Sequence, residues 1–229
     1  MGDIREHIAA VKERIAEAAL RSGRNPDGIT LVAVTKTIET HRIREGIAAG
    51  LTVFGENRVQ EAEGKIGEIG HGVRWHMIGH LQTNKVKRAV ELFDLIQSVD
   101  SLHLAGEIEK RASAVGRRIP VLLQVDLAGE ETKFGFTPEE LLRDLQGIAG
   151  CSHIEVSGLM TIPPFSPDPE RSRPYFTRLA HLAERIKEQC PGDVSMDILS
   201  MGMSQDYEVA VEEGATMIRI GTALFGARH

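Results

Sequence analysis

Eight short apolar runs recur along the chain, and they restrict the possible folds more than any other feature of the sequence. Each run is almost continuously hydrophobic and rich in Val, Ile and Leu, as expected for strands that are covered on both faces. Segments long enough for one helix separate consecutive runs, and each step is roughly 27 residues, close to the length of a βαβ unit. The runs cover residues 31–35, 51–55, 75–79, 95–99, 119–127, 154–160, 196–202 and 216–221.

Regular alternation of strand and helix predicts parallel strands, and eight repeats predict a closed (β/α)8 barrel. An additional amphipathic helix is expected in front of the barrel over residues 3–22, where Ile4, Ile8, Val11 and Ile15 lie on one helical face. A chain of 229 residues is of the usual size for one such barrel, so a single domain over residues 1–229 is expected. A doubly wound open sheet shows the same alternation and is the structural alternative.

The composition of the chain indicates which partners the protein can have and where in the cell it is located. The formal net charge is −6 and the isoelectric point is about 5.9, which argues against nucleic acid as the main partner. Two cysteines, Cys151 and Cys190, form no metal or disulfide motif. The first twenty residues carry charges every few positions and resemble neither a signal peptide nor a membrane span. A cytoplasmic protein without membrane association is therefore expected.

Two histidines in one run, His76 and His80, are four residues apart. The glutamate of the HExxH zinc motif is absent, and the pair lies at a strand end rather than on a helix. No metal site is predicted.

Functional residues of a parallel barrel lie at the carboxyl ends of its strands. Lys36 follows the first run, where its amine can form an imine with a carbonyl compound if a proton acceptor is near or its pKa is depressed. The alternative is an ordinary solvated lysine at the end of a strand.

The loops after the seventh and eighth runs have the composition of a phosphate site. The seventh contributes Ser200, Gly202 and Ser204, and the eighth contributes Gly221 and Thr222. Small residues allow backbone N–H groups to approach phosphate oxygens, and hydroxyls add donors. Glycines that merely form tight βα turns would explain either loop alone, but both loops occur at the positions where these barrels bind phosphate.

A phosphate site opposite an amine suits a ligand with a phosphate at one end and a carbonyl at the other, and pyridoxal phosphate has both. Its ring nitrogen would fall near the eighth strand, which contains Arg219. Arginine remains protonated at physiological pH, so it would donate to an unprotonated pyridine nitrogen and disfavour the protonated ring that withdraws electrons strongly. Such a site would bind the cofactor well and activate it weakly.

Several segments of the chain, in their order and spacing, resemble the pyridoxal phosphate homeostasis protein family. They are LVAVTK around Lys36, FGENRVQE around Asn57, WHMIGHLQTNKVK, SVDS, GLMTIPP and the long segment from LSMGMSQDYE to GTALFGAR. The resemblance covers essentially the whole chain. It implies a barrel of the alanine racemase N-terminal type, PLP fold type III, with pyridoxal phosphate held as a Schiff base.

The resemblance also implies roles for individual residues. Lys36 would form the Schiff base, Asn57 would line the cofactor ring, and Arg219 would face the pyridine nitrogen. The phosphate would be held by Ser200, Gly202, Gly221 and Thr222, with Met201 contributing its backbone. Lys133 matches a lysine-bearing loop of the family, and it is equally interpreted as a solvated loop lysine.

Two functions of different classes follow. The family resemblance implies a non-catalytic protein that binds pyridoxal phosphate, buffers it and delivers it to apoenzymes, and a monomer is expected. The alternative is a pyridoxal phosphate-dependent amino-acid racemase, which needs a second base opposite Lys36. We expect no such base, because Tyr175 and Tyr207 lie in predicted helices and no second domain follows the barrel. A lysine-imine aldolase or a phosphate-binding isomerase is a weaker third hypothesis.

Overall fold

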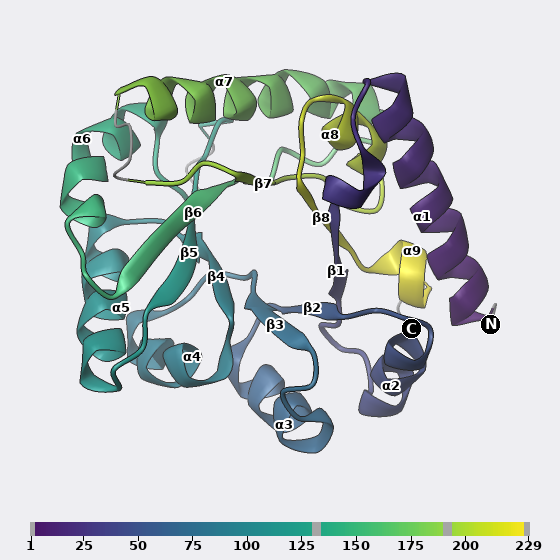
Figure 1. The fold of residues 1–229 in the computed structure, drawn as a ribbon, viewed down its shortest axis with the longest axis horizontal. Helices are drawn as coiled ribbons and strands as arrows, with labels where there is room; N and C mark the ends of the chain where they lie inside the picture. The colour runs from purple at the N-terminus through teal and green to yellow at the C-terminus, as the bar shows by residue number, and fades with distance from the viewer. Residues whose placement is uncertain (1–2, 130–133, 190–193, 227–229) are drawn as a thin grey trace.

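Eight parallel strands form a closed barrel in the order of the sequence (Figure 1). The computed structural model describes residues 3–129, 134–189 and 194–226. The strands are β1 (Thr30–Val34), β2 (Val53–Glu56), β3 (Arg74–Met77), β4 (Leu95–Val99), β5 (Ile119–Gln124), β6 (Ile154–Met160), β7 (Ile198–Ser200) and β8 (Met217–Ile220). Each of the eight apolar runs overlaps one strand, and the predicted barrel is confirmed over the open sheet.

Helices surround the barrel and cover the outer faces of the strands (Figure 1). They are α1 (Ile4–Arg21), α2 (Thr40–Ala48), α3 (Val59–Ile69), α4 (Val86–Leu92), α5 (Leu102–Ala114), α6 (Pro138–Ala149), α7 (Arg173–Gln189), α8 (Tyr207–Glu212) and α9 (Thr222–Phe225). Short 3₁₀ turns, η1 (Pro26–Gly28), η2 (Thr83–Lys85) and η3 (Pro169–Ser172), lie in the connections.

Local sequence determines where two of these helices begin. Asp3 accepts a hydrogen bond from the amide of Arg5 and starts α1, the helix predicted over residues 3–22. Thr137 and Glu140 form a reciprocal capping box at the start of α6, with Pro138 at the first helical position.

Pairing of the first strand with the last closes the barrel. Val32 of β1 lies opposite Arg219 of β8, and Ala33 lies opposite Ile220. Consequently the end of β1, where Lys36 follows, lies beside the end of β8. A separate cluster of six buried side chains takes one residue from each of six strands, as in the interior layers of such barrels: Val32, Val53, Leu95, Leu122, Met160 and Met217.

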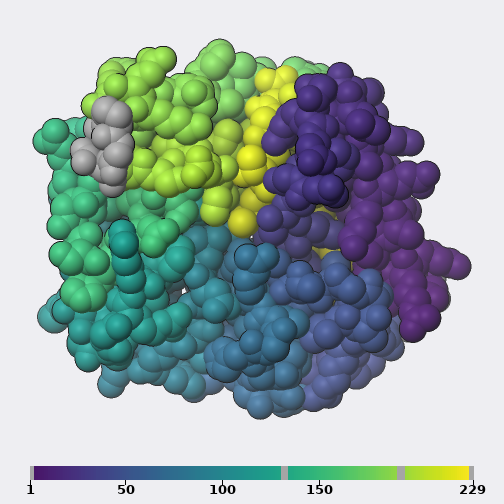
Figure 2. Space-filling model, viewed as in Figure 1, coloured from purple at the N-terminus to yellow at the C-terminus, as the bar shows by residue number. Residues whose placement is uncertain are grey.

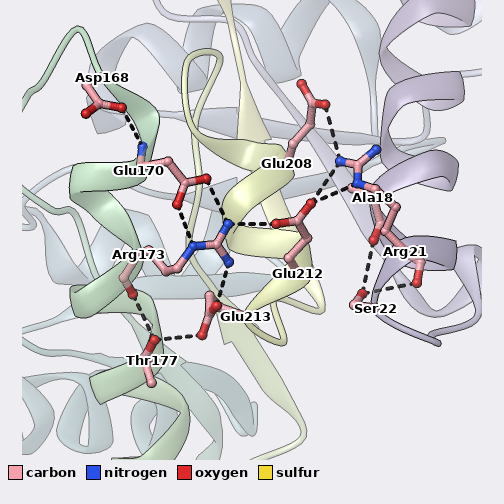
Figure 3. A network of polar contacts seen from close by, with 11 residues as sticks. Ala18, Arg21, Ser22, Asp168, Glu170, Arg173, Thr177, Glu208, Glu212 and Glu213 are labelled. Atoms are coloured by element: carbon pink, nitrogen blue, oxygen red, sulfur yellow. Dashed lines mark hydrogen bonds and ion pairs between the residues drawn. The ribbon is translucent and has the colours of Figure 1, made fainter.

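The additional helix α1 packs against α8 and α9. In the space-filling view, N-terminal residues (purple) and C-terminal residues (yellow) accordingly lie side by side at the surface (Figure 2). An ionic network joins this region to the start of α7 (Figure 3). Arg173 contacts Glu170, Glu212 and Glu213 at 2.6, 2.8 and 2.6 Å, and the Nε of Arg21 donates to Glu212 at 3.0 Å. The network therefore ties α1, η3, α7 and α8 together on one side of the barrel.

Over the three described ranges, no helix is both long and apolar enough to cross a membrane.

Candidate functional site

A cavity of about 520 Å³ opens at the carboxyl ends of β1, β6, β7 and β8. Four of the predicted site residues, Lys36, Arg219, Gly221 and Thr222, line it together. The rest of its wall comes from the loops that follow β6 and β7 and from neighbouring positions: Val34, Pro164, Phe165, Ser166, Met203, Ser204, Gln205, Asp206 and Ala223.

Lys36 lies in a tight turn directly after β1. The amide of Ile38 donates to the carbonyl of Thr35 at 2.9 Å, which places Lys36 and Thr37 at the two central positions. Thr37 has a φ of 63°, a conformation that glycine adopts readily and a β-branched residue rarely. The turn therefore presents Lys36 to the cavity at the expense of backbone strain at the next residue.

Arg219 is buried beneath the cavity, with 4% of its surface exposed. Its Nη1 donates to the hydroxyl of Ser200 at 2.5 Å, and its Nη2 donates to the carbonyl of Thr161 at 2.9 Å. Burial lowers the pKa of Arg219 to about 10, and the nearby carboxylate of Asp206 opposes that shift. The guanidinium therefore stays protonated at neutral pH and keeps further N–H donors beyond these two bonds.

A line of hydrogen bonds continues from Arg219 across the barrel interior. The Ser200 hydroxyl donates to Oε1 of Gln97 at 2.7 Å, and the Gln97 side-chain nitrogen lies 3.0 Å from Nδ1 of His76. Burial lowers the pKa of His76 to about 3, so its imidazole is neutral and Nδ1 can accept from Gln97. Each donor thus has an acceptor along the line, which holds the guanidinium in one place.

The loops after β7 and β8 meet at the cavity. Gly221 precedes α9, and its carbonyl accepts from the amides of Leu224 and Phe225 at 3.0 Å each. The hydroxyl of Ser204 accepts from the amide of Ala223 at 3.3 Å. The amides of Gly221 and Thr222 precede the first bonded turn of α9 and have no acceptor within that helix. An anionic group in the cavity would meet these amides and the exposed hydroxyl of Thr222.

Asp206 orders the loop after β7. Its Oδ1 accepts from the amide of Met203 at 2.7 Å, and its Oδ2 accepts from the hydroxyl of Ser172 at 2.8 Å. Because Ser172 ends η3, the cavity wall is connected to the element that carries the ionic network of Figure 3.

Three predicted phosphate ligands lie beneath the cavity instead of lining it. The Ser200 side chain is fully buried and bonds Arg219, as described above. The amide of Met201 donates to the carbonyl of Met217 at 3.1 Å, and the carbonyl of Gly202 accepts from the amide of Arg219 at 3.0 Å. Their place in the structure is to support Arg219 and the loop above it.

Asn57 follows β2 and lines two neighbouring hollows of about 580 and 220 Å³ rather than the cavity that holds Lys36. Its Oδ1 is buried without a hydrogen-bond partner in the described parts of the chain. An acceptor in that state is suited to a donor from a ligand. Lys133 lies outside the described residues.

Sequence reasoning missed Gln97, Thr161 and Asp206, which hold Arg219 and the cavity wall in place. Gln97 had a usable signal, because it is a polar residue in the middle of an apolar run and such residues need buried partners. Asp206 and Thr161 lie in loops whose path was not predictable from periodicity.

Comparisons with known proteins identify the family. The alanine racemase N-terminal domain family matches residues 7–229. The pyridoxal phosphate homeostasis protein of Aquifex aeolicus is 45% identical and covers 97% of both chains. The structure of PipY from Synechococcus elongatus with PLP bound is 39% identical, with a TM-score of 0.86 over 97% of this chain and 100% of that chain.

A more distant likeness concerns the fold alone. Alanine racemase of Clostridium difficile 630 is 16% identical, with a TM-score of 0.72 over 99% of this chain and 57% of that chain. The resemblance inferred from the sequence motifs is confirmed: the chain belongs to the pyridoxal phosphate homeostasis protein family, within the alanine racemase N-terminal domain family.

Proposed function

We propose that this protein binds pyridoxal 5'-phosphate in the Lys36 cavity as a Schiff base and contributes to pyridoxal phosphate homeostasis without catalytic turnover of its own. The observation that carries the proposal is the convergence of an amine, a buried guanidinium and two helix-start amides on one cavity. The names of the relatives and the PLP-bound PipY support the choice of ligand.

The donors around the cavity fit this cofactor. Pyridoxal phosphate supplies an aldehyde that condenses with amines and a ring that withdraws electrons when its nitrogen is protonated. Gly221, Thr222 and Ser204 would hold the phosphate, and Arg219 would donate to the ring nitrogen. The neutral amine of Lys36 would add to the aldehyde carbon, and loss of one water would leave a C=N bond.

Arg219 would donate to an unprotonated pyridine nitrogen and so disfavour the protonated ring that withdraws electrons strongly. The feature that favours a carrier over a racemase is the lack of a second base at the cavity, as far as the structure describes the chain. Among the described residues, neither Tyr175 nor Tyr207 lines the cavity. Tyr207 is buried and its hydroxyl has no hydrogen-bond partner among the described residues. Burial raises its pKa, so the hydroxyl stays protonated at neutral pH and is not available as a base.

The test is a visible spectrum of the purified protein with pyridoxal phosphate, before and after borohydride, followed by peptide mapping. We expect a band that bleaches on reduction and leaves a pyridoxyl group on Lys36. Lys36→Ala should lose the band and keep the apo-protein melting temperature within a few degrees. A retained band in that variant would refute the assignment to Lys36.

Two further assays separate the functions. Incubation of the holo-protein with L-alanine and other amino acids should leave their configuration unchanged, whereas turnover would establish the racemase alternative. Mixing the holo-protein with a pyridoxal phosphate-dependent apoenzyme should restore that enzyme faster than passive release allows. Restoration at the rate of passive release would limit the role to buffering.

A further inference from the structure

A buried ionic cluster lies directly behind the turn that carries Lys36, and nothing in the proposed function uses it. Lys65 of α3 is only 7% exposed, and Glu56 at the end of β2 is fully buried. The Lys65 Nζ donates to Oε1 of Glu56 at 2.8 Å and to Oε1 of Glu61 at 2.6 Å. A lysine is rarely buried to this extent, and its position calls for a specific role.

The cluster forms hydrogen bonds to the turn on both sides of Lys36. On the side before Lys36, the Lys65 Nζ donates to the carbonyl of Thr35 at 2.5 Å, and the Thr35 hydroxyl donates to Glu56 at 2.6 Å. On the side after Lys36, the amide of Thr37 donates to Glu61 at 2.5 Å. The Lys65 ammonium group therefore bonds the Thr35 carbonyl directly and is linked to the Thr37 amide through the Glu61 carboxylate.

The conformation of Thr37 explains why the turn needs these hydrogen bonds. A positive φ at a β-branched residue is costly, and such a conformation persists only where surrounding contacts enforce it. The amide of Thr37 is held by the cluster through its hydrogen bond to Glu61. Among the described residues, Lys65 and Glu61 are the residues of α3 that hydrogen-bond to the turn.

We propose that Lys65, acting through Thr35 and Glu61, is the positioning residue that holds the strained Thr35–Ile38 turn and so aims the Lys36 amine into the cavity. The proposal rests on the proposed function in so far as the amine is aimed at pyridoxal phosphate. Lys65 contacts the turn and not the ligand cavity, so its effect is exerted on Lys36.

The electrostatics of the two glutamates agree with this arrangement. Partial burial works against ionisation of Glu61, but hydrogen bonds from Lys65 and from the Thr37 amide outweigh it and lower the pKa of Glu61. Burial raises the pKa of Glu56 even though Lys65 and Thr35 donate to it. Glu61 is thus the carboxylate that stays ionised most easily, and it is the one that binds the turn amide.

The sequence itself indicates that Lys65 is buried. On α3 it lies on the same face as Val59, Ala62 and Ile66, all of which are buried. A lysine on the apolar face of a short helix, four residues after a glutamate, indicates a buried ionic partner.

The test measures how Lys65→Met acts in two backgrounds, one with Thr37 and one with Thr37→Gly. Glycine adopts a positive φ without steric cost, so the turn in that background no longer depends on the cluster. We expect Lys65→Met to slow growth of the imine absorbance, after mixing with pyridoxal phosphate, tenfold or more in the Thr37 background. In the Thr37→Gly background the same substitution should slow it threefold or less.

Controls keep the result interpretable. Lys187→Met removes a surface ion pair with Glu184 and should leave the rate unchanged. If Lys65→Met fails to fold, Glu61→Ala, on the outer side of the cluster, replaces it in the test. This variant should show the same slow rate, and Thr37→Gly should restore the rate. An equal slowing in both backgrounds, or none in either, would overturn the proposal.

A second measurement does not require the cofactor. The amides of Thr37 and Ile38 should exchange with solvent at least tenfold faster in apo Lys65→Met than in the apo wild type. Unchanged exchange would refute the positioning role. If the wild-type protein forms no imine, the proposed function fails while this exchange experiment still decides whether Lys65 holds the turn.

Discussion

Residues contribute to the proposed site in two different ways. The guanidinium of Arg219 is anchored from below by Ser200 and Thr161, whereas Thr222 presents a hydroxyl at the surface. Ser200 and Thr161 thus support the site from the folded core, whereas Thr222 is available to the ligand. Substitutions should separate these two roles.

We predict that Ser200→Ala lowers the free energy of unfolding of the apo-protein by about 1–3 kcal/mol, because Arg219 and Gln97 each lose a buried partner. Thr222→Val should leave apo stability unchanged and weaken pyridoxal phosphate binding about tenfold, by loss of one donor to a charged group. Urea unfolding and ligand titration check the pair. Equal apo stability of Ser200→Ala and wild type would contradict the supporting role of Ser200.

The same distinction explains which site residues were predictable from sequence. Lys36, Gly221 and Thr222 follow apolar runs, and the carboxyl ends of parallel strands meet at one face, so their convergence could be predicted. Ser200 is the last residue of β7, where a shift of one position exchanges the interior of the barrel for its outer face. Periodicity does not resolve that choice in a strand of three residues. The contacts of Lys65 with Glu56 and Thr35 were not predictable, because they depend on how α3 packs against the turn.

Among the structural elements around the site, the turn between β7 and α8 is tightly constrained. Gly202 has a φ of 90°, and a Cβ built there would lie 2.5 Å from the Cβ of Ala210 and 3.0 Å from the Cα of Tyr207. The turn therefore excludes a side chain for two reasons, conformation and contact with α8. Since the carbonyl of Gly202 holds the amide of Arg219, a shift of this turn moves the strand beneath the cavity.

We predict that Gly202→Ala destabilises the protein by about 1–3 kcal/mol more than the matched control Gly214→Ala, because overpacking adds to backbone strain. Gly214 also has a positive φ, of 103°, but a Cβ there would meet nothing within 4 Å. Urea unfolding of both variants measures the difference. Similar losses in the two variants would show that contact with α8 contributes little.

Strand positions were predictable to within a few residues, and the deviations have local causes. The fifth run, 119–127, is longer than β5, which ends at Gln124. Beyond it, Val125 forms an isolated bridge with Phe136, and its amide donates to the carbonyl of Met160 at 2.8 Å. The hydroxyl of Thr161 donates to the carbonyl of Val125 at 2.8 Å. The run continues as apolar sequence because Val125 and Leu127 remain buried, although the regular ladder has ended.

For the molecule as a whole, the buried neutral His76 makes stability depend on pH. Its pKa falls from an ordinary 6.5 to about 3 on folding. Below pH 6.5 the unfolded chain therefore binds a proton that the folded chain does not, and stability decreases as pH falls. Above pH 6.5 both states are neutral at this residue and its contribution is constant.

We predict that wild type loses about 2 kcal/mol more than His76→Gln between pH 7 and pH 5, at about 1.4 kcal/mol per pH unit below 6.5. Urea unfolding at pH 7, 6 and 5 measures the slopes. His181→Gln, at an exposed position of α7, is the control and should keep the wild-type slope. Parallel slopes for wild type and His76→Gln would show that His76 is not buried in the neutral form.

The pairing of β1 with β8 also determines at which stage of synthesis and folding the proposed site can form. During synthesis Lys36 emerges from the ribosome long before Arg219, Gly221 and Thr222. A nascent chain that ends before β8 has the amine but neither the guanidinium nor the amides of the cavity. The proposed site is complete only after β8 has joined β1, so we expect cofactor capture to follow translation of β8. A bound cofactor would therefore mark a chain whose barrel has closed.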